Sequence, residues 1–445
     1  MKNTRRDFIR KIATGSAGLA VGGLGLGFSS KSYGRINGAN DRISVGVMGT
    51  FGRGRNMARL FEQQHNTEVI YICDVDDFGI QRGVHAVKEV HGRTPKTEKN
   101  IFKVLEDNDL DAMMLAPPDH WHVPATIMSC AAGKHVYVEK PLGHNPREGE
   151  LAVEAARKYK RVVQMGSQRR SGQKLMEAID ELRGGVIGKV YMAKTWYTNN
   201  RSSIGVGKPA EVPLNLDYEL WQGPAPRRPY MDNIIHYNWH WFWHWGTGEA
   251  LNNGTHEVDV ARWGLGVDFP QKVNSVGGRY HFNDDWETPD TQIITFECND
   301  ACVVWEGRSC NGSLVEGEDR GVIFYGEHGT MRTGGNSYII SDLQDKVVKE
   351  VKSDFVMDGR DISSPSVALD TMHIANFLEC IRYGNLPNCD VEIGHKSTLW
   401  VQLGNIAQLV GRTLNIDQAN GHILGDQKAM NLWSREYEPG WEPKI

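Results

Sequence analysis

The sequence lacks the features that mark several classes of protein. Its seven cysteines are odd in number and none stand in a Cys-x-x-Cys spacing, so buried thiols are favoured over a disulfide framework or a zinc site. No internal repeat or low-complexity tract is present, which excludes repeat architectures. The remaining composition is that of an ordinary globular protein, with 24% charged residues, and 445 residues are enough for two domains.

Outside the N-terminus, acidic side chains outnumber basic ones. The formal net charge of the whole chain is −5. Residues 1–34 carry six basic side chains and one acidic one, a net charge of +5, so the chain without them has a net charge of −10. An acidic protein of this kind argues against nucleic acid or anionic lipid as a partner.

Residues 1–34 predict an export signal. Twin arginines precede an apolar, glycine-rich run at residues 12–28, and the small residues Ser32 and Gly34 mark a candidate cleavage site. The alternative, a membrane anchor, is disfavoured because about 20 strongly apolar residues are needed to cross a bilayer. The region has no cysteine to carry a lipid. We therefore expect a periplasmic protein, exported folded by the twin-arginine route and free of the membrane once the signal is removed.

A dinucleotide-binding unit is predicted at the start of the mature chain. The β-branched run at residues 42–48 leads into a glycine turn at residues 49–54, a helical stretch, and a second apolar run at residues 69–73. Asp74 follows, 20 positions after the last glycine, where an acidic side chain binds the adenosine ribose. Its negative charge would repel a 2′-phosphate, which favours NAD over NADP.

The glycine turn departs from the usual fingerprint at one position. Phe51 stands where the middle glycine is expected. Either Gly52 provides the close approach of the main chain to the pyrophosphate, or the pyrophosphate lies farther from the chain.

Residues 111–143 carry the second signal. They predict a strand at residues 112–116, a Pro117-Pro118 turn, a helix at residues 124–132, and a strand at residues 135–139 that leads directly into Lys140. Because ligands bind beyond the carboxyl ends of parallel strands, both turns face one crevice. The side chains placed there are those of His120, His122, Glu139 and Lys140.

Together these motifs resemble the Gfo/Idh/MocA oxidoreductases over nearly all of the mature chain. The resemblance rests on the glycine turn, Asp74, and the motifs PPDHWH (residues 117–122), AGKHVYVEKPL (132–142), GSQRRS (166–171) and GTHEVDVARW (254–263). It implies an oxidoreductase with a bound nicotinamide cofactor.

The predicted fold is α/β, with an N-terminal Rossmann domain followed by an α+β domain that has an open, mostly antiparallel sheet. The expected boundaries are a signal peptide at 1–34, the NAD-binding domain at 35–165, the substrate-binding domain at 166–425 and a tail at 426–445. Alternating polarity at residues 272–340 predicts the sheet, whose open face we expect to be buried in a homodimer or homotetramer. Helices are expected at residues 173–185, 249–265, 365–383 and 397–411, the last two packing against the first domain.

Two residues are expected to carry the chemistry. Oxidising a secondary hydroxyl requires a base that takes the hydroxyl proton, and Lys140 fits this role because burial and a nicotinium charge would lower its pKa. His256 is the other candidate, because relatives place a histidine here facing the substrate hydroxyl. Many relatives have an aspartate four positions earlier, whereas this chain has Asn252. An amide cannot act as a base, so the resemblance does not extend to a proton relay through that pair. A purely structural helix histidine is the alternative.

Residues 236–245 (HYNWHWFWHW) have the most unusual composition in the chain. An extended segment would place the tryptophans on one side for stacking on sugar rings, with His240 and His244 on the other. A helical segment could bind a transition metal through three histidines four residues apart, and a buried tryptophan core is the third reading. Relatives usually have arginine and aspartate near His240 and His244, so we expect a different substrate preference here.

The resulting assignments are as follows, with no metal site predicted. Cofactor-binding residues are Gly49, Phe51, Gly52, Arg53, Asp74, Pro118, His120, His122, Glu139, Lys140 and Gln168. Substrate-binding residues are Arg169, His240, Trp241, His244, Asn252 and Asn253, with Lys140 and His256 catalytic.

The predicted function is NAD-dependent oxidation or reduction of a secondary hydroxyl on a sugar or glycoside, with a tightly held cofactor. One alternative keeps the cofactor but predicts a glycosidase that oxidises C3 transiently, eliminates the substituent, adds water and reduces again. Another is a non-catalytic sugar sensor that binds the nucleotide without turnover; the presence of Lys140 and His256 argues against it.

Overall fold

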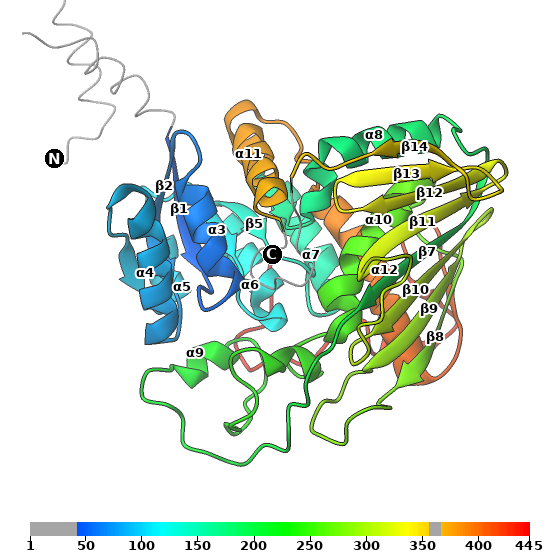
Figure 1. Ribbon diagram of the computed structural model, residues 1–445. Coiled ribbons are helices and arrows are strands. Elements are labelled where there is room, and N and C mark those ends of the chain that lie inside the picture. The colour runs from blue at the N-terminus through cyan, green and yellow to red at the C-terminus, as the bar shows by residue number, and fades with distance from the viewer. Residues whose placement is uncertain (1–41, 356–365) are drawn as a thin grey trace, which may run out of the picture. The chain divides into compact units, whose positions relative to one another are not determined.

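The structure is a computed structural model that describes residues 42–355 and 366–445, so the predicted export signal lies outside the described residues. Two sheets dominate it: a parallel sheet on the left of Figure 1 and a larger sheet on the right. The predicted fold class is confirmed.

The first sheet has six parallel strands in the order β3-β2-β1-β4-β5-β6, the Rossmann order with its switch point between β1 and β4. Its strands are β1 (Ile43–Met48), β2 (Thr67–Cys73), β3 (Lys96–Glu98), β4 (Ala112–Leu115), β5 (His135–Val138) and β6 (Val163–Met165). All four residues of β4 are buried, as expected for a strand covered on both faces.

Helices connect these strands. They are α3 (Arg53–Glu62), α4 (Asp77–His91), α5 (Ile101–Leu105), α6 (Asp119–Ala131) and α7 (Pro146–Lys158). The predicted start of α6 at residue 124 is wrong, because the helix begins five residues earlier and contains Pro124. A proline there leaves the carbonyl of His120 without its helical donor, and Arg435 of the C-terminal tail donates to that oxygen at 2.7 Å.

The second sheet has ten strands in the order β14-β13-β12-β11-β7-β10-β9-β8-β15-β16. They are β7 (Val190–Thr198), β8 (Lys272–Gly278), β9 (Thr291–Glu297), β10 (Cys302–Arg308), β11 (Arg320–Gly326), β12 (Gly329–Gly334), β13 (Ser337–Ser341), β14 (Val347–Val351), β15 (Leu414–Ile416) and β16 (Ile423–Leu424). The pairings are antiparallel except between β7 and β10, which confirms the mostly antiparallel prediction.

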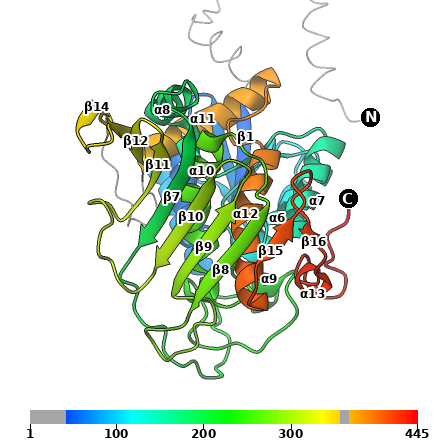
Figure 2. The same ribbon diagram turned by 90° about the vertical axis from the view of Figure 1, so that its right-hand side faces the viewer.

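Helices cover one face of this sheet. They are α8 (Gln173–Arg183), α10 (Thr255–Leu265) and α12 (Val391–Val410), and the opposite face is open toward the viewer in Figure 2. Burial alternates along β9, where Ile294 is buried and Ile293 exposed, as a sheet with one covered face requires. The shorter helices are η1 (Gln168–Ser171), α9 (Tyr218–Gln222), η2 (Asn238–Trp241), η3 (Ala250–Gly254) and α13 (Gln427–Met430).

Two late helices pack against the first domain, as predicted. Helix α11 (Val367–Tyr383) places Ile374, Phe377 and Leu378 in the same core as β1 and α3. Helix α12 begins six residues earlier than predicted and contacts α7 and β6 on one side and β8 on the other. The parallel sheet is thus covered by residues far along the chain.

In the part of the chain that the structure describes, no helix is both long enough and apolar enough to span a bilayer.

Candidate active site

The glycine turn after β1 brings the main chain close to the switch point. Gly49 adopts a φ of +83°, and a Cβ there would lie 2.5 Å from the carbonyl oxygen of Ala116. A Cβ on Gly54 would lie 2.0 Å from the oxygen of Gly49, whereas one on Gly52 would meet no atom within 4 Å. Helix α3 begins after Gly52 without a capping side chain. Its N-terminal amides therefore face open space that suits a pyrophosphate.

Asp74 stands at the end of β2 beside this turn. Its carboxylate accepts the amides of Thr50 at 2.6 Å and Asp76 at 3.0 Å, and helix α4 approaches it closely because residue 79 is glycine. Burial raises the pKa of Asp74, and the two amide donors lower it in part. The side chain lines the cavity described below, in the position that suits the adenosine ribose hydroxyls.

A segment of the second domain covers the region beside Asp74, where the adenosine of a dinucleotide would lie. We call residues 215–236 the strap. The amide of Asn215 and the Nε2 atom of His236 lie 3.0 and 2.7 Å from Asp76 Oδ2. The His236 ring stacks on Phe51 at 3.8 Å, and the guanidinium of Arg82 covers the same phenyl ring at 4.2 Å. Phe51, in place of a glycine, thus anchors the strap.

One cavity of about 510 Å³ runs along the carboxyl ends of the parallel strands to the second domain. This volume suits a small ligand site. Of the residues predicted for the site, those that line it are Gly49, Phe51, Gly52, Arg53, Asp74, Pro118, His122, Glu139, Lys140, Gln168, His240, Asn252, Asn253 and His256. Lys140 and His256 therefore reach the same cavity although they are far apart in sequence.

Lys140 is held by amide and carbonyl groups rather than by a carboxylate. Its ammonium donates to the main-chain oxygen of Asn252 and to Asn252 Oδ1, the latter at 3.0 Å. Desolvation lowers the pKa of Lys140 to about 8, although Glu139 and Asp119 raise it in part. Lys140 therefore titrates close to physiological pH, with a substantial neutral fraction.

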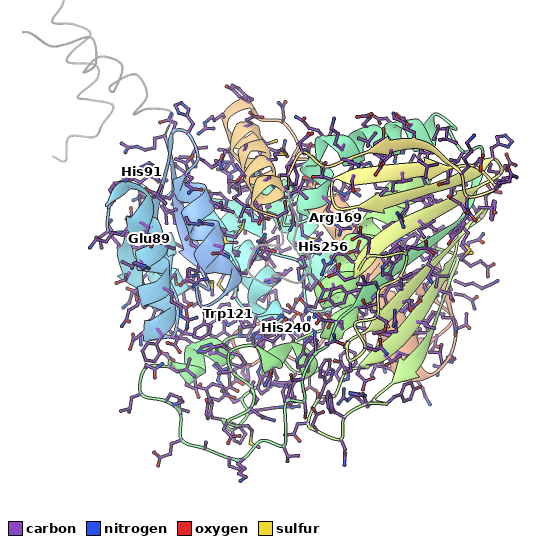
Figure 3. All side chains as sticks on the ribbon, viewed as in Figure 1. Glu89, His91, Trp121, Arg169, His240 and His256 are labelled. Atoms are coloured by element: carbon purple, nitrogen blue, oxygen red, sulfur yellow. The ribbon has the colours of Figure 1, made fainter. Side chains whose placement is uncertain are left out.

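Two imidazoles face the same end of the cavity as neutral groups. Burial holds the pKa of His256 well below its ordinary value, and the charges of Lys140 and Arg169 lower it further. Burial also holds the pKa of His240 well below its ordinary value. His240 Nδ1 lies 2.7 Å from the carbonyl oxygen of Tyr237, so Nδ1 carries the hydrogen and Nε2 the lone pair. Figure 3 labels His240 and His256 in the region between the two sheets.

Sequence reasoning missed a buried ionic network behind these groups. Arg201 pairs with Glu249 through Nε and through Nη2, the latter at 3.1 Å, and donates to the Tyr237 hydroxyl at 3.0 Å. Glu249 also accepts from the side chain of Asn253, whose own oxygen accepts from Arg320 at 2.9 Å. Arg201 and Arg320 both line the cavity. The clustering of Glu249 with two asparagines at one helix start was the only local signal.

Four predicted site residues are not brought to the cavity. His120 Nε2 bonds the carbonyl of residue 221 at 2.9 Å, and His244 Nε2 bonds that of residue 226 at 2.7 Å. Trp241 stacks on Trp286 at 4.0 Å. Arg169 forms a buried ion pair with Glu257. His122 does line the cavity, but its two nitrogens face the carbonyls of Pro117 and Pro141.

The extended arrangement predicted for residues 236–245 is wrong. Residues 238–241 form a 3₁₀ helix, and Trp241 and Trp245 are fully buried while Trp239 lines the cavity. The histidines of this segment bond different groups, and among the described residues no cluster of His, Cys, Asp or Glu could hold a metal ion. The metal-binding alternative is therefore set aside.

The site accommodates a dinucleotide at one end and leaves polar groups unpartnered at the other. Two buried atoms, Gln168 Oε1 and His256 Nδ1, have no hydrogen-bond partner among the described residues. Both line the cavity at the end where Lys140 lies. Buried polar groups of this kind are usually satisfied by a ligand or water.

Comparison with known families matches both halves of the chain. Residues 43–167 match the NAD-binding Rossmann fold of the oxidoreductase family, and residues 191–442 match its C-terminal alpha/beta domain. Curated relatives include a glycosyl hydrolase family 109 protein of Saccharopolyspora erythraea, 25% identical over 52% of this chain and 55% of that protein. An alpha-N-acetylgalactosaminidase of Shewanella oneidensis is 24% identical over 43% of this chain and 45% of that protein. The matches span about half the length of these relatives.

Solved structures share the fold at low identity. Levoglucosan dehydrogenase in complex with NADH and levoglucosan superposes with a TM-score of 0.66 at 14% identity, covering 85% of this chain and all of that one. The WlbA dehydrogenase of Chromobacterium violaceum, in complex with NADH and UDP-GlcNAcA, gives 0.63 at 18% identity over 85% and 96% of the two chains.

Proposed function

Because this chain belongs to the Gfo/Idh/MocA oxidoreductase family, whose first domain binds NAD, we propose that it transfers a hydride at a secondary hydroxyl of a sugar or glycoside. The observation that carries the proposal is the convergence of Lys140, His240 and His256 on the cavity that begins at the glycine turn. When bound, NAD accepts a hydride from the carbinol carbon and can return it.

Lys140 supplies the base for this step. As the C–H electron pair leaves the carbon as hydride, the hydroxyl proton passes to the neutral Nζ atom and a ketone remains. A pKa of about 8 places this amine near the value that suits a general base at physiological pH. His256, neutral and unprotonated on one ring nitrogen, holds the same oxygen from another side.

The redox-assisted glycosidase is the second candidate, favoured by the family 109 relatives. After oxidation at C3, the hydrogen on C2 lies beside a carbonyl and is acidic. A base removes it, the C1–O bond breaks, and the leaving group takes a proton; water then adds across the C1–C2 double bond before the ketone is reduced. The lone pair of His240 Nε2 suits the base at C2, because the carbonyl of Tyr237 fixes the proton on Nδ1.

The cofactor is tightly held. The strap bonds Asp76 through Asn215 and His236, and it covers the adenosine end of the cavity. A retained nucleotide suits a protein exported folded to the periplasm, where free nicotinamide nucleotide is scarce. Denaturing the purified protein should release close to one NAD per chain, and its complete absence would count heavily against retention.

The open face of the ten-stranded sheet serves as the interface of a homodimer or homotetramer. The face carries exposed apolar side chains, among them Val276 and Ile293, on a surface that no helix covers in Figure 2. Light scattering on the purified protein tests this, and a monomer at micromolar concentration would refute it.

One experiment separates the two candidate functions. The purified protein is incubated with a panel of α- and β-glycosides while NADH absorbance and free reducing sugar are both recorded. Net NADH formation without release of the substituent supports the dehydrogenase. Sugar release without net absorbance change supports the glycosidase. Lys140→Ala should abolish either signal, and unchanged turnover would refute the mechanism.

A further inference from the structure

The cations around the reacting end of the cavity are unequally neutralised. Arg53 pairs with Glu139 at 2.9 Å and with Asp370 at 2.6 Å. Arg201 pairs with Glu249, and Arg169 pairs with the buried Glu257. These three guanidinium groups each have an acidic partner. Their charges are therefore balanced within the protein.

Lys140 and Arg320 are different. Among the residues that the structure describes, no carboxylate oxygen lies within hydrogen-bonding distance of either one. The ammonium of Lys140 contacts only oxygens of Asn252. Arg320 lies 3.9 Å from Glu257, and Arg169 already occupies the other oxygen of that carboxylate. Asp119 also lines the cavity, but it bonds the hydroxyl of residue 247.

Arg320 has unused donors. It is the first residue of β11 and is 8% exposed. One terminal nitrogen donates to Asn253 at 2.9 Å, and the guanidinium packs over the Tyr197 ring at 4.6 Å. Its Nε atom has no partner among the described residues although it is buried. A guanidinium held flat in this way, with donors free, matches the geometry of a carboxylate.

A neutral sugar would leave this arrangement unbalanced. Arg169 and Arg320 would share the single carboxylate of Glu257, no carboxylate among the described residues would lie within hydrogen-bonding distance of Lys140, and the nicotinium ring would add a further positive charge. Buried cations without a partner are strongly disfavoured.

We propose that the substrate is an acidic sugar, a hexuronic acid or its glycoside, whose carboxylate binds Arg320. This inference rests on the proposed function, because it assumes that the sugar occupies the end of the cavity where Lys140 lies. The carboxylate then orients the ring from one side while Lys140 contacts the hydroxyl that reacts. Arg320 acts as a specificity-determining residue and takes no part in proton transfer.

The test uses matched substrates that differ in one charge. Each hexopyranoside, in gluco and galacto configuration and as both anomers, is compared with its hexuronate and with the methyl ester of that hexuronate. The full chain with its retained nucleotide is used, and kcat/KM is measured through NADH absorbance and sugar release. We expect the hexuronate of one configuration to exceed both neutral forms by roughly 10- to 100-fold, as hydrogen bonds to a charged group predict.

Variants then assign the preference to Arg320. Arg320→Met should lower kcat/KM for the hexuronate by roughly 10- to 100-fold, chiefly through KM, without lowering that for its methyl ester, and Arg320→Lys should restore part of it. Arg332→Met is the matched control, because it removes a cation from the adjacent strand outside the cavity. Nucleotide content and the urea midpoint show that each variant is folded.

The outcomes separate this inference from the proposed function. If neutral sugars are turned over as well as hexuronates, or if Arg320→Met lowers both equally, the inference is wrong and the proposed function stands. If folded protein with bound NAD turns over none of the sugars, the proposed function fails as well.

Discussion

Replacing Lys140 by methionine should separate stability from activity. Burial lowers the pKa of Lys140 from its ordinary 10.5 to about 8, so the folded state binds its proton more weakly than the unfolded chain. At about 1.4 kcal/mol per pH unit, the protonated ammonium costs the folded state about 3 kcal/mol at pH 7 and less than about 1 kcal/mol at pH 10. Methionine has a similar length and removes this cost at every pH.

The variant also loses the hydrogen bonds from Lys140 to Asn252, worth about 1–2 kcal/mol at any pH. Lys140→Met should therefore be more stable than the native protein at pH 7 by about 1–2 kcal/mol and less stable at pH 10 by up to about 1 kcal/mol. Turnover should fall by about 10²- to 10⁴-fold because the base is gone.

Urea unfolding of nucleotide-free protein at pH 7, 8, 9 and 10 measures this difference. All other titrating groups are common to the two proteins, so the change in their stability difference reports Lys140 alone. A difference that stays constant from pH 7 to 10 would refute the reasoning, because it would mean that the amine titrates alike in the folded and unfolded states.

Three further outcomes follow from the geometry. Gly54→Ala places a methyl group 2.0 Å from the oxygen of Gly49, so the Tm and the nucleotide content should both fall. In Gly52→Ala the added methyl group meets no atom within 4 Å, so only the nucleotide content should fall. Equal losses of Tm in the two variants would contradict this. His236→Ala removes a bond that holds the strap to Asp76 and should speed NAD release by about tenfold, as expected for the loss of one hydrogen bond to a charged group. Release is followed by the loss of NADH fluorescence on dialysis, and an unchanged rate would exclude a clamping role for the strap. Glu257→Gln leaves buried guanidinium groups unpaired and should cost about 3 kcal/mol in urea unfolding, so a cost below about 1 kcal/mol would show that water reaches them.

The parts of the site that the sequence predicts are those encoded over short distances. A glycine turn after a β-branched strand, Asp74 at the next strand end and Lys140 at a later one follow from alternation and turn chemistry within a few residues. Parallel strands then bring their carboxyl ends together without further information. The Rossmann domain and its crevice could therefore be derived before any coordinates.

The remaining site depends on contacts between distant segments. Arg201 meets Glu249 across 48 positions, and Arg320 meets Asn253 across 67; neither arginine lies in a recognisable motif. The prediction for residues 236–245 was wrong because their alternating histidines and tryptophans suggest an extended strand, whereas Trp241 and Trp245 are both buried in the interior. Burial of the indole rings decided the local conformation, and that depends on neighbours the segment does not contain.

Helix α11 has a consequence for biosynthesis. Its residues Ile374, Phe377 and Leu378 complete the apolar core beside β1, about 200 positions after the last strand of that sheet. A nascent chain that has emerged only as far as β6 would leave this apolar surface exposed to water, so the first domain cannot complete its core until α11 has been synthesised. Loading with NAD should then follow the emergence of α11, and a truncated dinucleotide domain expressed alone should be prone to aggregation.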